Sequence, residues 1–102
     1  MRYQLSGPVT GRSYVDAAAE FEAAATRLMD RHEDAWCFVP TMSLGSDVSH
    51  ERAMRVCIGY LVRHADALVT LPGWESSKGA SLEVAVAKAI GKPVMTLEEA
   101  LR

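Results

Sequence analysis

The stretch of sequence that decides the fold is Leu71–Glu83, which reads LPGWESSKGASLE. The apolar run Ala67–Leu71 leads into this stretch and predicts a buried strand, and Leu82–Ile90 continues from it with the pattern of a helix. A strand, a loop of small polar residues and a helix N-terminus, in that order, form the arrangement in which α/β proteins collect ligand-binding groups. Glu83 therefore has two open interpretations: it complements the helix dipole, or it is a reactive carboxylate.

The alternation of strand and helix continues along the whole chain. Three helical patterns are predicted, at about Ser13–Arg31, His50–His64 and Ser81–Ile90. Short apolar segments bounded by Gly, Pro or polar residues are typical of buried parallel strands. The predicted strands are Tyr3–Leu5, Trp36–Val39, Ala67–Leu71 and Pro93–Met95. This order predicts a three-layer α/β sandwich with a four- to five-stranded parallel sheet.

Local signals refine this order. Ser49 is expected to cap the second helix, because its hydroxyl can accept a bond from a free N–H of the first turn. The run Thr96-Leu97-Glu98-Glu99 fits a capping box and predicts a last short helical turn. Pro40–Val48 is the longest predicted loop, and loops of this kind often border a site.

Length and composition predict a single domain over residues 1–102. Hydrophobic residues make up 49% of the chain and charged residues 24%, which is ordinary for a globular protein. The formal net charge is −2 and there is no basic block, so a nucleic acid polymer is not an expected partner. No apolar run approaches the roughly 20 residues that span a bilayer, and the N-terminus lacks the apolar core of a signal peptide. We therefore expect no membrane partner and a cytoplasmic location.

The cysteines and histidines do not predict a metal centre. Cys37 and Cys57 are far apart and are expected to be free thiols. His32, His50 and His64 show neither an i,i+4 pair nor the Cys/His spacing of a zinc site. We expect no bound metal.

Two loops are candidates for binding a nucleotide. The first strand runs into residues 6–12, SGPVTGR, where two glycines allow close backbone approach and Ser6, Thr10 and Arg12 are possible donors. The second loop, Ser76–Ser81, lies at a helix N-terminus, which favours an anion such as phosphate. Each loop is equally consistent with a plain turn, but two such loops after parallel strands reinforce each other.

These residues together resemble the nucleoside 2-deoxyribosyltransferase superfamily, and within it the small DUF4406-like members. The resemblance is carried by residues 5–11 (LSGPVTG), 65–74 (ADALVTLPGW), 77–83 (SKGASLE) and 87–94 (AKAIGKPV). It implies a flavodoxin-like or Rossmann-like parallel sheet and a homodimer or larger homo-oligomer. It also implies cleavage of the N-glycosidic bond of a nucleoside or nucleotide, without metal or redox cofactor.

The resemblance also implies roles for individual residues. Glu83 falls at the position of the catalytic nucleophile, which attacks the anomeric carbon and stabilises oxocarbenium charge. Ser77, six residues earlier, matches a serine that binds the 5′-phosphate of nucleoside monophosphates, which favours a nucleotide over a free nucleoside. The residues expected to bind substrate are Ser6, Gly7, Pro8, Thr10, Gly11, Ser77, Gly79, Asp66 and Trp74.

The chain departs from the family pattern at two positions. Cys57 stands where an Asp of the second helix usually helps to protonate the leaving base; a thiol can in principle donate a proton, and Cys is equally a common core residue. Gln4 replaces a Tyr that steadies the nucleophile. Asp66 is also consistent with a turn residue before the third strand, and Trp74 with a lid over the core.

The sequence therefore favours an enzyme that hydrolyses or transfers the N-glycosidic bond of a (deoxy)nucleoside 5′-monophosphate or nucleoside. The departures at Cys57 and Gln4 favour a second hypothesis, a nucleotide-binding module that senses or sequesters without turnover. A third hypothesis is a phosphoribohydrolase of the lysine-decarboxylase-like family, although that family carries a tighter glycine run than Pro72-Gly73-Trp74.

Overall fold

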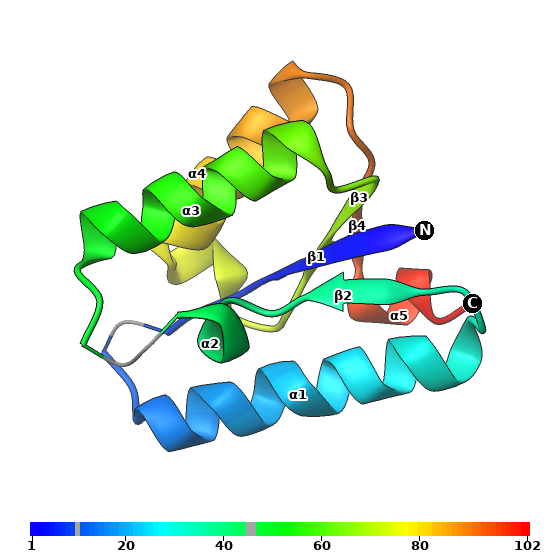
Figure 1. Ribbon diagram of the computed structural model, residues 1–102, viewed down its shortest axis with the longest axis horizontal. Coiled ribbons are helices and arrows are strands. Elements are labelled where there is room, and N and C mark those ends of the chain that lie inside the picture. The colour runs from blue at the N-terminus through cyan, green and yellow to red at the C-terminus, as the bar shows by residue number, and fades with distance from the viewer. Residues whose placement is uncertain (10, 45–46) are drawn as a thin grey trace.

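The sheet of the protein is parallel throughout. In the computed structural model, which describes residues 1–9, 11–44 and 47–102, four strands lie in the order β2-β1-β3-β4 (Figure 1). The strands are β1 (Arg2–Ser6), β2 (Trp36–Phe38), β3 (Ala67–Thr70) and β4 (Val94–Thr96). The predicted parallel sheet is confirmed, and each strand end agrees with its prediction to within one residue.

Helices cover both faces of the sheet, as the predicted sandwich requires. The helical elements are α1 (Tyr14–Arg31), α2 (Pro40–Ser43), α3 (His50–Arg63), the 3-10 turn η1 (Trp74–Ser76), α4 (Lys78–Ala89) and α5 (Leu97–Ala100). Figure 1 shows α1 and α5 on one face and α3 and α4 on the other. Both α2 and η1 lie in the connections that follow β2 and β3. The fold is therefore a flavodoxin-like or Rossmann-like sandwich.

Helix ends differ from the sequence prediction in two places. α4 begins at Lys78 rather than Ser81, because the Ser77 side chain caps it by accepting the Ala80 N–H at 3.2 Å. The segment predicted to be the longest loop contains α2, which has Pro40 at its first position, where a missing N–H costs nothing. The Ser49 cap and the capping box at Thr96 are confirmed.

The pleat of β1 divides its side chains between the two faces of the sheet. Tyr3 and Leu5 join the apolar cluster that packs under α1 and α5. Successive residues of a strand point to opposite faces, so Gln4 and Ser6 point toward α3 and α4. Both are buried, with 0% and 1% of their surface exposed. Two polar side chains are therefore buried in the layer that also contains Glu83.

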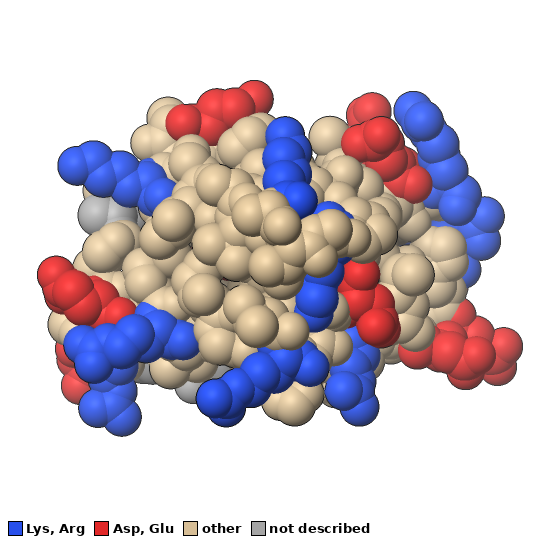
Figure 2. Space-filling view, turned by 90° about the horizontal axis from the view of Figure 1, so that it is seen from above, with Lys and Arg blue, Asp and Glu red and all other residues tan. Residues whose placement is uncertain are grey.

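The outer face of α3 and α4 has charges of both signs. Figure 2 shows this face, with Lys and Arg interspersed with Asp and Glu around an uncharged middle region. Within residues 1–9, 11–44 and 47–102 no helix combines the length and hydrophobicity that a bilayer crossing needs. Over the same residues, His, Cys, Asp and Glu side chains do not gather in groups of three or more that would hold a metal ion.

Candidate functional site

A cleft of about 730 Å³ opens at the carboxyl ends of β1 and β2, where the first turns of α3 and α4 also meet. Its walls are the turn after β1, α2, the N-terminal half of α3 and the start of α4. We call this space the cleft throughout. It lies where parallel α/β folds collect ligand-binding groups, because the strand ends and helix N-termini all point there.

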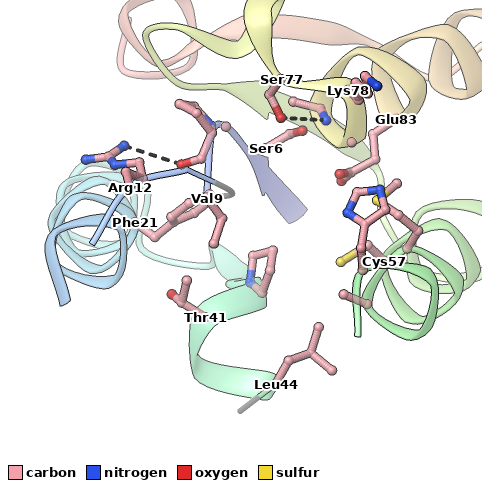
Figure 3. Close-up of a pocket in the computed structure, with 18 of the residues that line it drawn as sticks. Ser6, Val9, Arg12, Phe21, Thr41, Leu44, Cys57, Ser77, Lys78 and Glu83 are labelled. Carbon is pink, nitrogen blue, oxygen red and sulfur yellow. Dashed lines mark hydrogen bonds between the residues drawn. The ribbon is translucent and has the colours of Figure 1, made fainter. Parts of the chain in front are cut away.

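Glu83 projects into the cleft from the second turn of α4. Its carboxylate points into the open space in Figure 3, although only 5% of the residue surface is exposed. The side-chain amide of Gln4 holds one of its oxygens, because Nε2 donates to Glu83 Oε1 at 2.9 Å. The same Nε2 donates to the backbone carbonyl of Cys57 at 3.0 Å. A single glutamine of β1 thus ties together α3 and α4 at the base of the cleft.

The environment of Glu83 brings its ionisation into the neutral range. Burial raises the pKa of this carboxyl from its ordinary value of 4.5 to about 7. Bonding to Gln4, and proximity to the Ser6 hydroxyl, lower the pKa and offset part of the burial effect. Glu83 is therefore about half ionised near pH 7, so it can serve as a nucleophile or base and can also carry a proton.

Cys57 lies beside this carboxyl on α3 and is buried, with 4% of its surface exposed. Burial, and secondly the negative charge of Glu83, raise the pKa of its thiol to about 12. The thiol therefore stays neutral near pH 7, and so high a pKa makes it a poor proton donor. This environment resembles that of a buried apolar cysteine more than that of a catalytic acid.

Two hydroxyls at the cleft have free hydrogen-bonding capacity. Neither Ser6 Oγ nor Thr41 Oγ1 makes a hydrogen bond of good geometry to any residue that the structure describes, and both atoms are buried. Buried polar groups are normally satisfied, so these two hydroxyls are available to hydrogen-bond a molecule in the cleft. Ser6 comes from β1 and Thr41 from α2.

The N-terminus of α4 forms one wall of the cleft and suits an anion. Its first residues, Lys78 and Gly79, have backbone N–H groups without helical partners, and the helix dipole adds positive potential. Ser77 Oγ accepts the N–H of Ala80, which leaves its own O–H proton available for a ligand. Gly79 lies close to α3, since an added Cβ would lie 2.9 Å from Met54 Sδ and the end of that side chain would have to shift.

Cationic side chains outnumber anionic ones around the cleft. Arg12 and Lys78 line it together with the imidazole of His50, and Glu83 is its acidic member among the described residues. Arg12 is partly engaged, because its Nη1 donates to Glu20 Oε1 at 3.2 Å and to the carbonyl of Pro8 at 3.3 Å (Figure 3 shows the second bond). In a chain of net charge −2, this local excess of positive groups favours an anionic ligand.

Most of the residues predicted to form the site lie together at the cleft. The structure brings to it both predicted catalytic residues and six of the predicted substrate-binding residues: Glu83, Cys57, Ser6, Gly7, Pro8, Gly11, Ser77 and Gly79. Thr10 lies outside the residues that the structure describes.

Two predicted binding residues lie elsewhere. Asp66 precedes β3 at the amino ends of the strands, opposite the cleft, where its Oδ2 accepts the backbone N–H of Arg2 at 2.7 Å. A parallel strand has its amino end away from the cleft, so this carboxylate fastens β1 to the start of β3. Trp74 packs against the apolar cluster under α3 and α4, in agreement with the alternative of a lid over the core.

Sequence reasoning missed Thr41 and His50 as cleft residues. Thr41 lies in α2, which is too short to give a periodic pattern, and its backbone carbonyl accepts from the Tyr14 hydroxyl at 2.5 Å. His50 was considered only as a metal ligand, yet its imidazole approaches the first turn of α4, with Cε1 3.6 Å from the position of a Cβ at Gly79. Its place at the first position of α3, right after the predicted Ser49 cap, was the available signal.

Comparison with known proteins matches the chain to a protein family. A family described as "Domain of unknown function (DUF4406)" matches residues 1–96, nearly the whole chain. No curated protein and no solved structure matches the chain.

Proposed function

The chain belongs to the DUF4406 family, and we propose that it cleaves the N-glycosidic bond of a nucleoside 5′-monophosphate or nucleoside through Glu83. The observation that carries the proposal is a buried carboxylate with a pKa of about 7, aimed into a cleft whose other charged groups are cationic. The resemblance of the sequence to the nucleoside 2-deoxyribosyltransferase superfamily supports the same reaction.

The chemistry follows from the environment of the carboxylate. Breaking a C–N glycosidic bond builds positive charge on the sugar, which an adjacent ionised Glu83 stabilises. An oxygen of Glu83 then bonds to the anomeric carbon while the base leaves with the C–N electron pair and takes a proton from water. Water or a second base attacks the resulting ester and frees the carboxylate. The reaction requires no metal or redox cofactor.

The substrate class follows from the two walls of the cleft. The N-terminus of α4, with Lys78 and the Ser77 hydroxyl, suits a phosphate, and His50 adds a donor beside it. The turn of Ser6 and Gly7 brings the backbone close to the sugar. These groups favour a nucleoside monophosphate over a free nucleoside.

The test is release of free base from a panel of ribo- and deoxynucleoside monophosphates, followed by chromatography. We expect Glu83→Ala to reduce the rate at least a hundredfold, since it removes the nucleophile. Glu75→Ala is the matched control, because Glu75 is an exposed glutamate of the adjacent turn that does not line the cleft. Equal rates for wild type and Glu83→Ala, with base released by both, would refute the proposal.

The environment of Cys57 favours a second candidate, a module that binds nucleotides without turnover. A thiol whose pKa is about 12 gives little help to a leaving base, and general-acid help is commonly worth about 10²–10⁴ in rate. Calorimetric binding of a nucleotide without base release over a day supports this candidate. Base release restored or accelerated by Cys57→Asp identifies instead an enzyme of reduced rate.

We also propose that the protein forms a homodimer through the outer face of α3 and α4. Large apolar side chains are exposed along both helices, at Val56 and Val62 of α3, at Leu82 of α4 and at Ile90 directly after α4. A second copy can cover them in an isologous contact, with charges of both signs at the rim (Figure 2). Light scattering tests this, and we expect Leu82→Glu to convert a dimer to a monomer; a wild-type monomer at high concentration would contradict it.

A further inference from the structure

Gln4 is a completely buried polar residue in the middle of a strand, with 0% of its surface exposed. It spans three elements: its backbone belongs to β1, and its side chain reaches Glu83 on α4 and the carbonyl of Cys57 on α3. A glutamine in the core of a sheet costs free energy unless its amide is satisfied, so its presence calls for an explanation.

The two acceptors fix the orientation of the amide. Glu83 Oε1 and the Cys57 carbonyl oxygen both lie within 3.0 Å of Gln4 Nε2, and neither can donate when Glu83 is ionised. A flipped amide would put its oxygen against two other oxygens. The opposite end, Gln4 Oε1, is buried and makes no hydrogen bond with a described residue. The amide is thus oriented by the carboxylate even though this leaves its own oxygen unpaired.

We propose that Gln4 is a positioning residue that holds Glu83 Oε1 and thereby makes Oε2 the oxygen that attacks the sugar. The inference rests on the proposed function for the reaction itself. In the attack a lone pair of Oε2 forms the bond to the anomeric carbon, the C–N bond breaks, and its electron pair leaves with the base, which water protonates. Oε1, bonded to Gln4 throughout, becomes the carbonyl oxygen of the ester.

The same contact keeps the nucleophile ionised. The Gln4 amide donates one hydrogen bond to the charged form of Glu83 and lowers its pKa, against the larger raising effect of burial. The other titratable or charged groups at the cleft are Cys57, His50, Lys78, Arg12 and Tyr14. The Cys57 thiol is neutral near pH 7. Removing the Gln4 amide therefore takes away the largest effect that lowers the pKa of Glu83, while the raising effect of burial remains.

The experiment is a ¹³C NMR titration of the Glu83 carboxyl in wild type and in Gln4→Met, which keeps the side-chain length and removes the amide. We expect the carboxyl to titrate about one to two pH units higher in Gln4→Met, as loss of a hydrogen bond to a charged group implies. An unchanged titration would overturn the proposal. Because the titration needs no turnover, it stands or falls apart from the proposed reaction.

Kinetics then test the positioning role. If wild type releases base, the acid limb of the pH–rate profile for Gln4→Met should shift to higher pH by the same amount as the NMR titration. In addition, kcat at high pH should fall about tenfold or more with KM changed less than threefold. A higher KM with an unchanged kcat would show that Gln4 only shapes the cleft, and would overturn the positioning role. If Gln4→Met does not fold, Gln4→Asn retains an amide one methylene too short to reach Glu83, and the same shift is expected.

Discussion

Replacing Glu83 by glutamine should stabilise the protein at neutral and alkaline pH while abolishing its proposed chemistry. The substitution keeps the shape of the side chain and removes its charge. The new amide oxygen can still accept the bond from Gln4 Nε2, and its N–H group can donate to Ser6 Oγ, which has no partner among the described residues. The main change is therefore the loss of a buried ionisable group.

The magnitude follows from the pKa of Glu83. That pKa is raised from 4.5 to about 7 on folding, so between these pH values the folded protein keeps a proton that the unfolded chain has released. Stability accordingly falls as pH rises from about 4.5 to 7, and the loss is complete above pH 7. At about 1.36 kcal/mol per pH unit, the loss is about 1 kcal/mol at pH 5 and about 3 kcal/mol at pH 8.

The assay is urea unfolding of wild type and Glu83→Gln at pH 5 and pH 8. We expect the free energy of unfolding of the variant to exceed that of wild type at both pH values. The excess should be about 2 kcal/mol larger at pH 8 than at pH 5, which corresponds to a further Tm increase of roughly 10 °C. Glu22→Gln, at an exposed position of α1, is the control and should change stability by less than about 0.5 kcal/mol. A difference that does not grow with pH would refute the reasoning, because it would mean that Glu83 ionises as easily in the folded protein as in the unfolded chain.

Three further predictions follow from the same structure. Base release should rise tenfold per pH unit below about pH 7 and level off above it, as Glu83 becomes ionised; a flat profile measured from pH 5 to 8 would contradict this. Lys92→Met should lower the free energy of unfolding by about 1–2 kcal/mol, because Lys92 Nζ bonds three carbonyls at the end of α3; urea curves of exposed Lys88→Met, as control, should shift far less. Gly79→Val should lower the free energy of unfolding by about 1–3 kcal/mol by crowding α3. Gly59→Ala, whose added methyl meets nothing within 4 Å, should raise it by about 0.5–1 kcal/mol, and equal melting temperatures of the two variants would argue against tight packing at Gly79.

The fold was predictable because its signals are local and repeated. Each strand is a short apolar run and each long helix has a 3.6-residue stripe, so the order of elements alone predicts a parallel sandwich. The start of α4 was misplaced for a physical reason. Ser77 and Ser81 are both possible N-caps and Gly79 is a poor helix former, so the sequence does not favour the earlier start; the first turn forms because Ser77 caps it and Gly79 lies close to α3. α2 has four residues, too few for any periodic pattern.

The site was predictable only in part, because its central contact joins residues far apart in the sequence. Gln4 and Glu83 are 79 residues apart, and a polar residue in a three-residue apolar run does not reveal its partner. The sequence marked Gln4 as a departure from the family pattern, whereas the structure shows a buried amide bonded to the carboxylate. Asp66 was predicted to bind substrate, but the structure places it away from the cleft, because it precedes β3 and the cleft lies at the carboxyl ends of the strands.

The position of Glu83 links the stability of the fold to its proposed chemistry. A carboxylate in an apolar layer costs free energy, and Gln4 and Ser6 reduce that cost only in part, since the pKa of Glu83 remains near 7. If the residue served only the helix dipole, an exposed position in the first turn would provide the same benefit without burial. Selection for stability alone would favour an apolar residue or an amide there. A buried acid in the second turn, facing a cleft that also contains the Thr41 hydroxyl without a partner within the described residues, is the arrangement expected where stability has been given up for binding or catalysis.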